Sequence, residues 1–142
     1  GRIIYNAGLV RAELESYVPR AISVLALAES GGFSYPYKKL DRSFFTELHQ
    51  RDASVDDWLL HHNGQLSDST FANLAFFDGN HWYTPSFPLL RGVRRQQLLD
   101  EGRLRTTNIK VSDLSAFAEV SLINGMLDLG ELRLPCNCIR RI

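Results

Sequence analysis

The chain has 142 residues, of which 44% are hydrophobic and 23% charged, and its 16 Lys and Arg residues balance 16 Asp and Glu residues. This size and composition predict one globular domain, or little more, whose core needs neither a disulfide nor a metal. The zero net charge argues against an extended interface with nucleic acid or an anionic membrane. Because the sequence also contains no signal peptide and no apolar run near 18 residues, we expect no membrane-spanning segment.

The two cysteines, Cys136 and Cys138, are close enough in sequence to hold one metal ion together. A structural zinc site needs four ligands, however, and no second Cys/His pair has the required spacing. The adjacent His61 and His62 would point to opposite faces of a strand. Free thiols in a reducing compartment are the simpler interpretation, which predicts a cytoplasmic protein without a metal.

The first half of the chain predicts strands followed by a helix. Residues 2–14 begin as a strand and turn at Asn6-Ala7-Gly8, so the chain opens inside a sheet. The apolar run 22–28 predicts a buried strand, and residues 31–37 predict a turn. A helix is expected over residues 42–51, with Asp41 as its N-cap and Phe44, Phe45 and Leu48 along one face.

Two dipeptides in the centre, Asn63-Gly64 and Asp78-Gly79, have the composition of two-residue hairpin turns. Both central positions of a type I′ turn need a positive φ, which Asn, Asp and Gly tolerate best. We therefore expect three consecutive antiparallel strands, which end at Pro85 and Pro88.

The last third predicts a helix, a strand, a short helix and a final buried strand. The first helix follows Gly92 and ends before Gly102, and its Arg95 is expected to face solvent. Residues 103–111 predict a strand, residues 112–117 a short helix capped by Ser112, and residues 118–125 a buried strand. The last residues, 138–142, are interpreted as a charged tail. Strands with interspersed helices and an antiparallel meander predict an α+β fold.

Four positions could carry chemistry, although each has an ordinary structural explanation. Lys38 and Lys39 lie in a turn, where a lysine is normally a solvated cation. Asp68 could satisfy local amides as an Asx turn. Gly92 could simply give the backbone conformational freedom before a helix, and Asn124-Gly125 could be one more turn.

Taken together, these positions supply what pyridoxal phosphate (PLP) requires. A desolvated lysine can react with the cofactor's aldehyde, and two adjacent lysines lower each other's pKa. A carboxylate can pair with the ring nitrogen and keep it protonated, while open backbone amides at a helix start can bind the phosphate.

The same residues resemble a known family, the fold-type IV PLP-dependent enzymes. These include branched-chain and D-amino-acid aminotransferases and 4-amino-4-deoxychorismate lyase. The segment "YKKLDR" is similar to the family's lysine segment, which implies that Lys38 binds the cofactor as a Schiff base and then acts as the catalytic base. The stretch "DSTFANL" resembles the family's acid-to-Asn-Leu motif. This places Asp68 opposite the ring nitrogen and Asn73 at the motif's asparagine.

Two further segments complete the resemblance. "GVRR" is similar to the family's Gly-Ile-Thr-Arg phosphate loop, which implies that Gly92, Val93 and Arg94 bind the phosphate. "INGM" resembles the final strand's Thr/Cys-Asn-Ala and places Asn124 and Gly125 on the phosphate's other side. The order of the four matches holds across residues 18–142.

The resemblance implies a largely antiparallel, barrel-like large domain over residues 18–142. Residues 1–17 would be the last hairpin and linker of a small N-terminal domain whose remainder is missing. The family also implies a homodimer, a small amino-acid or aminochorismate-type substrate, and aminotransferase or lyase chemistry; Tyr35 and Tyr37 either line the pocket or pack in the core. Three departures are Asp68, one methylene shorter than the usual glutamate, Arg94 in place of a small hydroxyl residue, and the missing N-terminal part. They favour the alternative of a non-catalytic or truncated relative that does not hold PLP.

Overall fold

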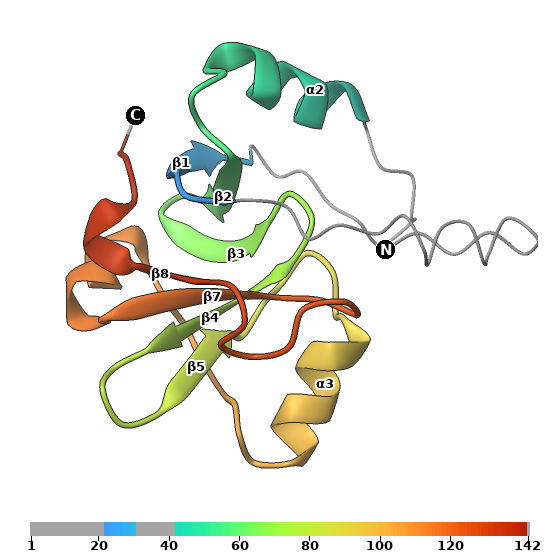
Figure 1. Ribbon diagram of the computed structural model, residues 1–142, viewed down its shortest axis with the longest axis vertical. Helices are drawn as coiled ribbons and strands as arrows, with labels where there is room; N and C mark the ends of the chain where they lie inside the picture. The colour runs from blue at the N-terminus through green and yellow to red at the C-terminus, as the bar shows by residue number, and fades with distance from the viewer. Residues whose placement is uncertain (1–21, 31–41, 142) are drawn as a thin grey trace, which may run out of the picture.

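The computed structural model describes residues 22–30 and 42–141. Over these ranges the chain forms eight strands, two α-helices and two 3-10 helices (Figure 1). The strands are β1 (Leu25–Glu29), β2 (Asp57–His62), β3 (Gln65–Ser69), β4 (Asn73–Phe77), β5 (Trp82–Pro85), β6 (Arg105–Thr107), β7 (Glu119–Ile123) and β8 (Arg133–Pro135). The helices are α2 (Arg42–Arg51) and α3 (Val93–Asp100), and the 3-10 helices are η1 (Val111–Ala116) and η2 (Cys136–Cys138).

The strands form one largely antiparallel sheet. Strands β1 to β6 pair in sequence order, and β7 pairs with β4 and with β8. Only the pairings of β1 with β2 and of β5 with β6 are parallel among these described strands. The predicted α+β class with a mostly antiparallel sheet is therefore confirmed.

The end of the described chain closes the sheet into a barrel-like shape. After η2, the backbone N–H of Arg140 donates to Leu25 O at 2.8 Å, and Leu27 N–H donates to Arg140 O at 3.0 Å. The apolar cluster inside includes Leu59, Leu74 and Phe76, all fully buried. The expectation of a charged tail is wrong for Ile139 and Arg140, since Ile139 is buried in the core and Arg140 pairs with β1.

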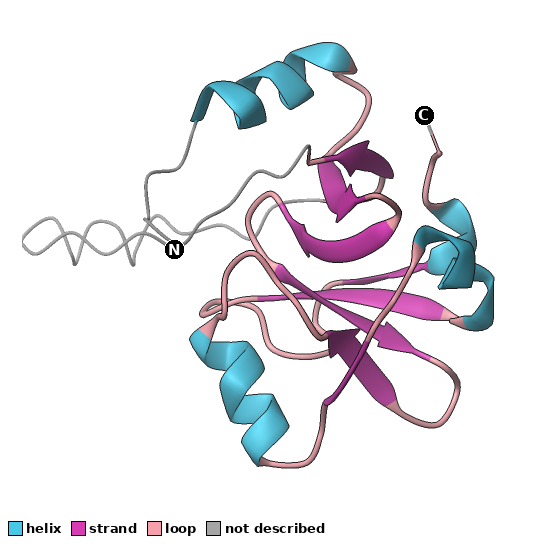
Figure 2. Ribbon diagram, turned by 180° about the vertical axis from the view of Figure 1, so that it is seen from behind, coloured by secondary structure: helices cyan, strands magenta, loops and turns pink. Residues whose placement is uncertain are grey.

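The two α-helices lie outside the sheet, at separate places on the molecule (Figure 2). Each packs on one of two smaller apolar clusters. Trp58 and Leu60 are two residues apart in β2 and therefore point to the same face of the sheet. Leu48 of α2 packs against both of them there. Leu98 of α3 packs with Ala75 of β4 and Ile123 of β7. Asn73 lies on the same face of β4 as Ala75, since it is two residues away.

The expected three-strand meander is in fact four strands, because residues 65–77 are interrupted by a turn. Ser69 N–H donates to Ala72 O at 2.9 Å, and Ser69 Oγ accepts the N–H groups of Phe71 and Ala72. The turn pairs Asp68 with Asn73 across β3 and β4. Nothing in the composition of "SDSTFAN" marks this turn as clearly as the Asn-Gly dipeptide marks its neighbour.

One of the two predicted hairpin turns is confirmed. Asn63 and Gly64 have φ values of 51° and 86°, as a type I′ turn requires. The second turn spans four residues, 78–81, instead of two. The Asp78 carboxylate accepts the N–H groups of Asn80 and His81 at 2.8 and 2.7 Å, so its side chain favours a wider loop.

The helix predictions are mostly confirmed. Helix α2 has the expected bounds, and α3 ends just before Gly102, whose φ of 74° is typical of a glycine that terminates a helix. The short helix η1 is a 3-10 helix with Lys110, not Ser112, at its N-cap. Lys110 N–H donates to Asp113 Oδ2 at 2.9 Å, which replaces the expected serine cap. Strand β6 covers only three residues of the expected strand.

Several expectations concern residues outside the described ranges. These are the opening strand and turn, the boundary between residues 1–17 and 18–142, the turn after β1, and the Asp41 cap. They remain predictions.

Candidate functional site

Asp68 lies at the centre of the candidate site. It belongs to β3 and is only 3% exposed. Its Oδ1 accepts a hydrogen bond from Asn73 Nδ2 at 3.1 Å, and its Oδ2 accepts the N–H of Leu90 at 2.9 Å. Each carboxylate oxygen has two lone pairs, so both can accept one further donor.

Burial raises the pKa of Asp68 to about 6, because the charged form is poorly solvated inside the protein. Smaller effects lower its pKa: hydrogen bonds from the backbone near Leu90 and from Asn73, and the positive charge of Arg95. A cation placed against Asp68 would lower its pKa further and so stabilise the ionised carboxylate.

Asn73 joins Asp68 to the loop between β5 and α3. The Asn73 side chain is buried, and its Nδ2 also donates to Leu90 O at 2.7 Å. A Cβ atom built on Gly92 would lie 2.3 Å from Asn73 Oδ1, so only a glycine fits there without a shift. The predicted site residues Asp68, Asn73 and Gly92 are thus brought together, and Leu90 links them.

The first turn of α3 presents open backbone amides. The first intrahelical hydrogen bond runs from Gln96 N–H to Gly92 O at 3.1 Å, and the N-cap Gly92 has no side chain to offer. The N–H groups of Val93, Arg94 and Arg95 precede that bond and point out of the helix start. Such a helix start favours an anion.

Arg94 connects α3 to the turn after β7. Its Nη2 lies 3.5 Å from Gly125 O, and its Nη1 lies 3.9 Å from Asp128 Oδ1. Its Nε is buried and has no hydrogen-bond partner among the described residues. The two segments predicted to flank a phosphate, residues 92–94 and 124–125, are therefore neighbours.

Asn124 serves the local turn. Its Oδ1 accepts the N–H groups of Met126 and Leu127 at 2.8 and 3.0 Å, and its Nδ2 donates to Phe71 O at 3.4 Å. Gly125 is exposed, and a Cβ atom there would meet nothing within 4 Å. The simple turn considered for this dipeptide is thus present, beside the start of α3.

Arg95 is the residue that sequence reasoning missed. It was expected to face solvent, but it is 2% exposed and its Nη2 donates to Pro85 O at 3.1 Å. Two signals pointed to it: Arg95 lies three residues before the buried Leu98, and it occupies the arginine position of the Gly-Ile-Thr-Arg motif. Its guanidinium acts electrostatically on Asp68 from inside the protein.

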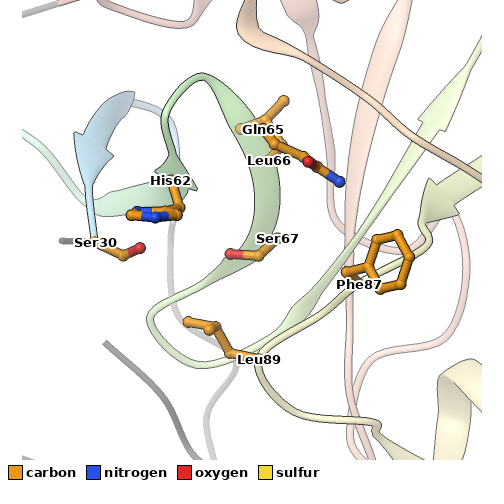
Figure 3. Close-up of a pocket in the computed structure, with 7 residues that line it drawn as sticks. All are labelled: Ser30, His62, Gln65, Leu66, Ser67, Phe87 and Leu89. Carbon is orange, nitrogen blue, oxygen red and sulfur yellow. The ribbon is translucent and has the colours of Figure 1, made fainter. Parts of the chain in front are cut away.

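A pocket of about 310 Å³ opens between the end of β1, the β2–β3 hairpin and the loop after β5 (Figure 3). Ser30, His62 and Ser67 give it polar groups, and Phe87 and Leu89 give it apolar ones. Ser67 and Leu89 directly precede Asp68 and Leu90 in the chain, but Asp68, Asn73 and Leu90 themselves do not line this pocket. Lys38, Lys39, Tyr35 and Tyr37 lie outside the described residues.

Comparison with known proteins identifies the family of the chain. The sequence model of amino-transferase class IV matches residues 9–133. The chain belongs to the class IV aminotransferase family. The recognition of a fold-type IV relative, which includes the aminodeoxychorismate lyases, is thereby confirmed.

This family member is similar to an uncharacterized protein of Haemophilus influenzae, with 32% identity over 88% of the chain and 66% of that protein. The crystal structure of a proposed 4-amino-4-deoxychorismate lyase from Haemophilus somnus superposes with a TM-score of 0.72 at 28% identity, covering 80% of this chain and 58% of that one. A hypothetical aminotransferase from Mycobacterium tuberculosis in a PLP-bound form shares the fold, with a TM-score of 0.62 at 15% identity over 84% of this chain and 48% of that one. The class IV chain therefore spans less than two thirds of these relatives.

The described residues of this class IV chain fit PLP. Asp68 keeps free acceptor capacity and has a pKa that responds to a neighbouring cation. The start of α3 offers open amides beside a guanidinium whose buried Nε lacks a partner there. These are the two groups that a pyridine nitrogen and a phosphate require. No helix in the described ranges combines the length and apolar character needed to cross a membrane.

Proposed function

We propose that the protein containing this chain is a PLP-dependent enzyme acting on a small amino acid or an aminochorismate-type compound. The observation that carries the proposal is the hydrogen-bonded link from Asp68 to the loop that begins α3. It holds a buried carboxyl group and an anion-favouring helix start in one rigid unit. Family membership supports the same cofactor.

The proposed roles follow from the chemistry of each residue. Bound PLP supplies an aldehyde that reacts with amines and a ring that accepts electrons. Lys38 is the proposed covalent attachment point and the base that removes the proton from the substrate α-carbon. Asp68 would pair with the ring nitrogen as a carboxylate and favour its protonated form.

The phosphate would lie at the start of α3. The backbone of Gly92 and Val93 and the side chain of Arg94 would bind it from one side, and the turn at Asn124 and Gly125 would face it from the other. The pocket of about 310 Å³ between β1, the β2–β3 hairpin and the loop after β5 is of a size that suits a small substrate.

The whole protein's architecture is part of the proposal. Residues 18–142 would form the cofactor domain, and residues 1–17 would end a small N-terminal domain that helps to complete the site. The family resemblance supports a homodimer. Aminotransferase and lyase activity differ in outcome: one moves an amino group to a keto acid, and the other releases a side-chain substituent.

Titration of the purified protein with PLP tests the proposal. We expect a new absorption band in the near-visible region that is lost in Lys38→Ala and kept in the matched variant Lys39→Ala. Asp68→Ala should weaken binding, because the ring nitrogen loses its counter-ion. A protein that stays colourless at saturating PLP would favour the alternative of a relative that does not hold the cofactor.

A second assay separates the two reactions. The PLP-loaded protein is incubated with single amino acids and a keto acid, and the new amino acid is measured. An aminochorismate-type compound is tested in parallel for release of its side-chain substituent. Product in one arm only assigns the reaction, and no product in either arm argues against catalysis on these substrates.

A further inference from the structure

Asn73 uses both of its amide hydrogens within the protein. Its Nδ2 donates to Asp68 Oδ1 at 3.1 Å and to Leu90 O at 2.7 Å. An amide nitrogen carries two hydrogens, so no donor of Asn73 is left for a bound molecule. The side chain is 5% exposed and lies where β4 pairs with both β3 and β7.

Leu90 completes a closed triangle of contacts. Its N–H donates to Asp68 Oδ2 at 2.9 Å, while its carbonyl accepts the Asn73 amide. Each of Asp68, Asn73 and Leu90 therefore contacts the other two. Because buried hydrogen bonds are costly to break, the triangle holds the loop backbone against β3 and β4.

Gly92 makes the same connection through close packing. A Cβ atom at this position would lie 2.3 Å from Asn73 Oδ1 and 3.5 Å from its Cγ. Real Cβ atoms do not approach an oxygen that closely, so a larger residue would push the loop or the asparagine away. Gly92 is also the N-cap of α3, so Asn73 packs directly against the start of the helix.

We propose that Asn73 is a positioning residue, which couples the Asp68 carboxyl group to Leu90 and Gly92 and thereby sets where α3 begins. This inference rests on the proposed function and assigns Asn73 no contact with the cofactor. It refines the sequence expectation, in which Asn73 was a cofactor-binding residue. The distance between the groups that face the ring nitrogen and the phosphate would then depend on Asn73.

A double-mutant cycle in the protein without cofactor tests the coupling. Gly92→Ala should raise the unfolding equilibrium constant at least about tenfold, because its Cβ collides with Asn73. In the Asn73→Ala background, Gly92→Ala should raise the unfolding equilibrium constant by less than about threefold, because the colliding oxygen is gone. Gly125→Ala, where a Cβ meets nothing, is the stability control and should show no coupling. Equal costs of Gly92→Ala in both backgrounds overturn the proposal.

A second readout separates positioning from general stability and does not need Gly92→Ala to fold. The carboxyl resonance of Asp68 is followed by NMR as a function of pH. Asn73→Ala should move its midpoint upward, because a donor to the ionised form is lost while Arg95, the charged group acting on Asp68 among the described residues, remains. Asn108→Ala removes a surface amide bonded to Gln65 and should leave the midpoint unchanged. An unchanged midpoint in Asn73→Ala contradicts the coupling.

The cofactor readout distinguishes this proposal from the proposed function. Asn73→Ala should weaken PLP binding about tenfold, which is the equivalent of one hydrogen bond to a charged group, while Asn108→Ala should not. If the unaltered protein binds no PLP, the proposed function fails, and the double-mutant cycle and the NMR titration still decide the coupling. Full PLP affinity in a folded Asn73→Ala protein overturns the positioning role.

Discussion

At the scale of single residues, the buried carboxyl group of Asp68 has the largest consequence. Burial under the loop before α3 raises its pKa, and only hydrogen bonds and the more distant Arg95 oppose this. A carboxyl group with a raised pKa binds its proton more tightly in the folded state than in the unfolded state. Its contribution to stability is therefore present at low pH and is lost as the pH rises through its folded pKa.

Asp68→Asn should remove this pH dependence in the protein without cofactor. The change from an ordinary 3.8 to about 6 corresponds to about 3 kcal/mol. The free energy of unfolding of the unaltered protein should fall by most of that amount relative to Asp68→Asn between pH 4 and pH 8. Urea unfolding at several pH values measures this difference. Leu66→Val in the same strand, which changes no charged group, is the control for the pH dependence. A difference between the two proteins that stays constant with pH contradicts the buried, proton-binding Asp68.

Arg95 offers a second prediction at this scale. Arg95→Ala should destabilise the protein by about 2–3 kcal/mol, because it leaves Pro85 O without its donor and removes buried packing. Arg94→Ala, one residue away and half-exposed, should cost within about 0.5 kcal/mol, because its ion pair is solvated. Urea unfolding compares the two variants. Equal effects would mean that Arg95 is not anchored inside the protein.

The candidate residues were found from motif order, and what they touch was not predictable. Asp68, Asn73 and Gly92 lie within 24 positions of one another in the sequence. Only the folded chain shows that the Asn73 amide donates both of its hydrogens, one to Asp68 and one to Leu90. The burial of Arg95 was likewise missed, because a run of polar residues on a short helix suggests a solvated face. Long-range contacts decide both cases, and local patterns do not encode them.

At the scale of elements, turns show which local signals are strong. Asn63-Gly64 forms the predicted type I′ turn. Asp78-Gly79 instead begins a four-residue loop, because the Asp78 carboxylate accepts the N–H groups of Asn80 and His81. Both dipeptides look alike in sequence. The turn at residues 69–72 was missed because it contains no glycine or asparagine to mark it. It is stabilised instead by Ser69, whose Oγ accepts the N–H groups of Phe71 and Ala72.

Gly64→Ala should destabilise the β2–β3 hairpin by about 1–2 kcal/mol, because φ is 86° there and an L side chain resists that conformation. Asn63→Gly, which keeps access to positive φ, is the matched control and should change stability by less than about 0.5 kcal/mol. Thermal unfolding of both variants measures the difference. A neutral Gly64→Ala contradicts the type I′ turn.

At the scale of the whole molecule, the return of the chain to β1 closes the sheet. The class and the antiparallel character were predictable from the alternating pattern and the turns. The closure was not, because it depends on backbone hydrogen bonds between Arg140 and β1, and backbone bonds carry no sequence signature. Ile139 is buried in the core although exposed residues flank it on both sides, so the charge of "CIRRI" concealed a core residue.

Ile139→Ala should cost about 2–3 kcal/mol, because this side chain is buried in the barrel interior and its loss leaves a cavity. Arg140→Ala keeps the backbone bonds to Leu25 and Leu27 and should cost under about 1 kcal/mol through its contact with Ser54. Urea unfolding compares them, and hydrogen exchange of the Leu27 amide reports on the closure. If Arg140→Ala proves the more damaging change, the closure depends on its side chain and not on its backbone.

The most direct measurement of the central claim is the position at which PLP attaches. The protein is mixed with PLP, reduced with borohydride, digested and mapped by mass spectrometry. The chain contains three lysines, Lys38, Lys39 and Lys110, so the result is unambiguous. We predict modification at Lys38 alone at stoichiometric PLP, with none in Lys38→Ala. Equal labelling of all three lysines, or labelling that persists in Lys38→Ala, would contradict a cofactor site built on Lys38 and Asp68.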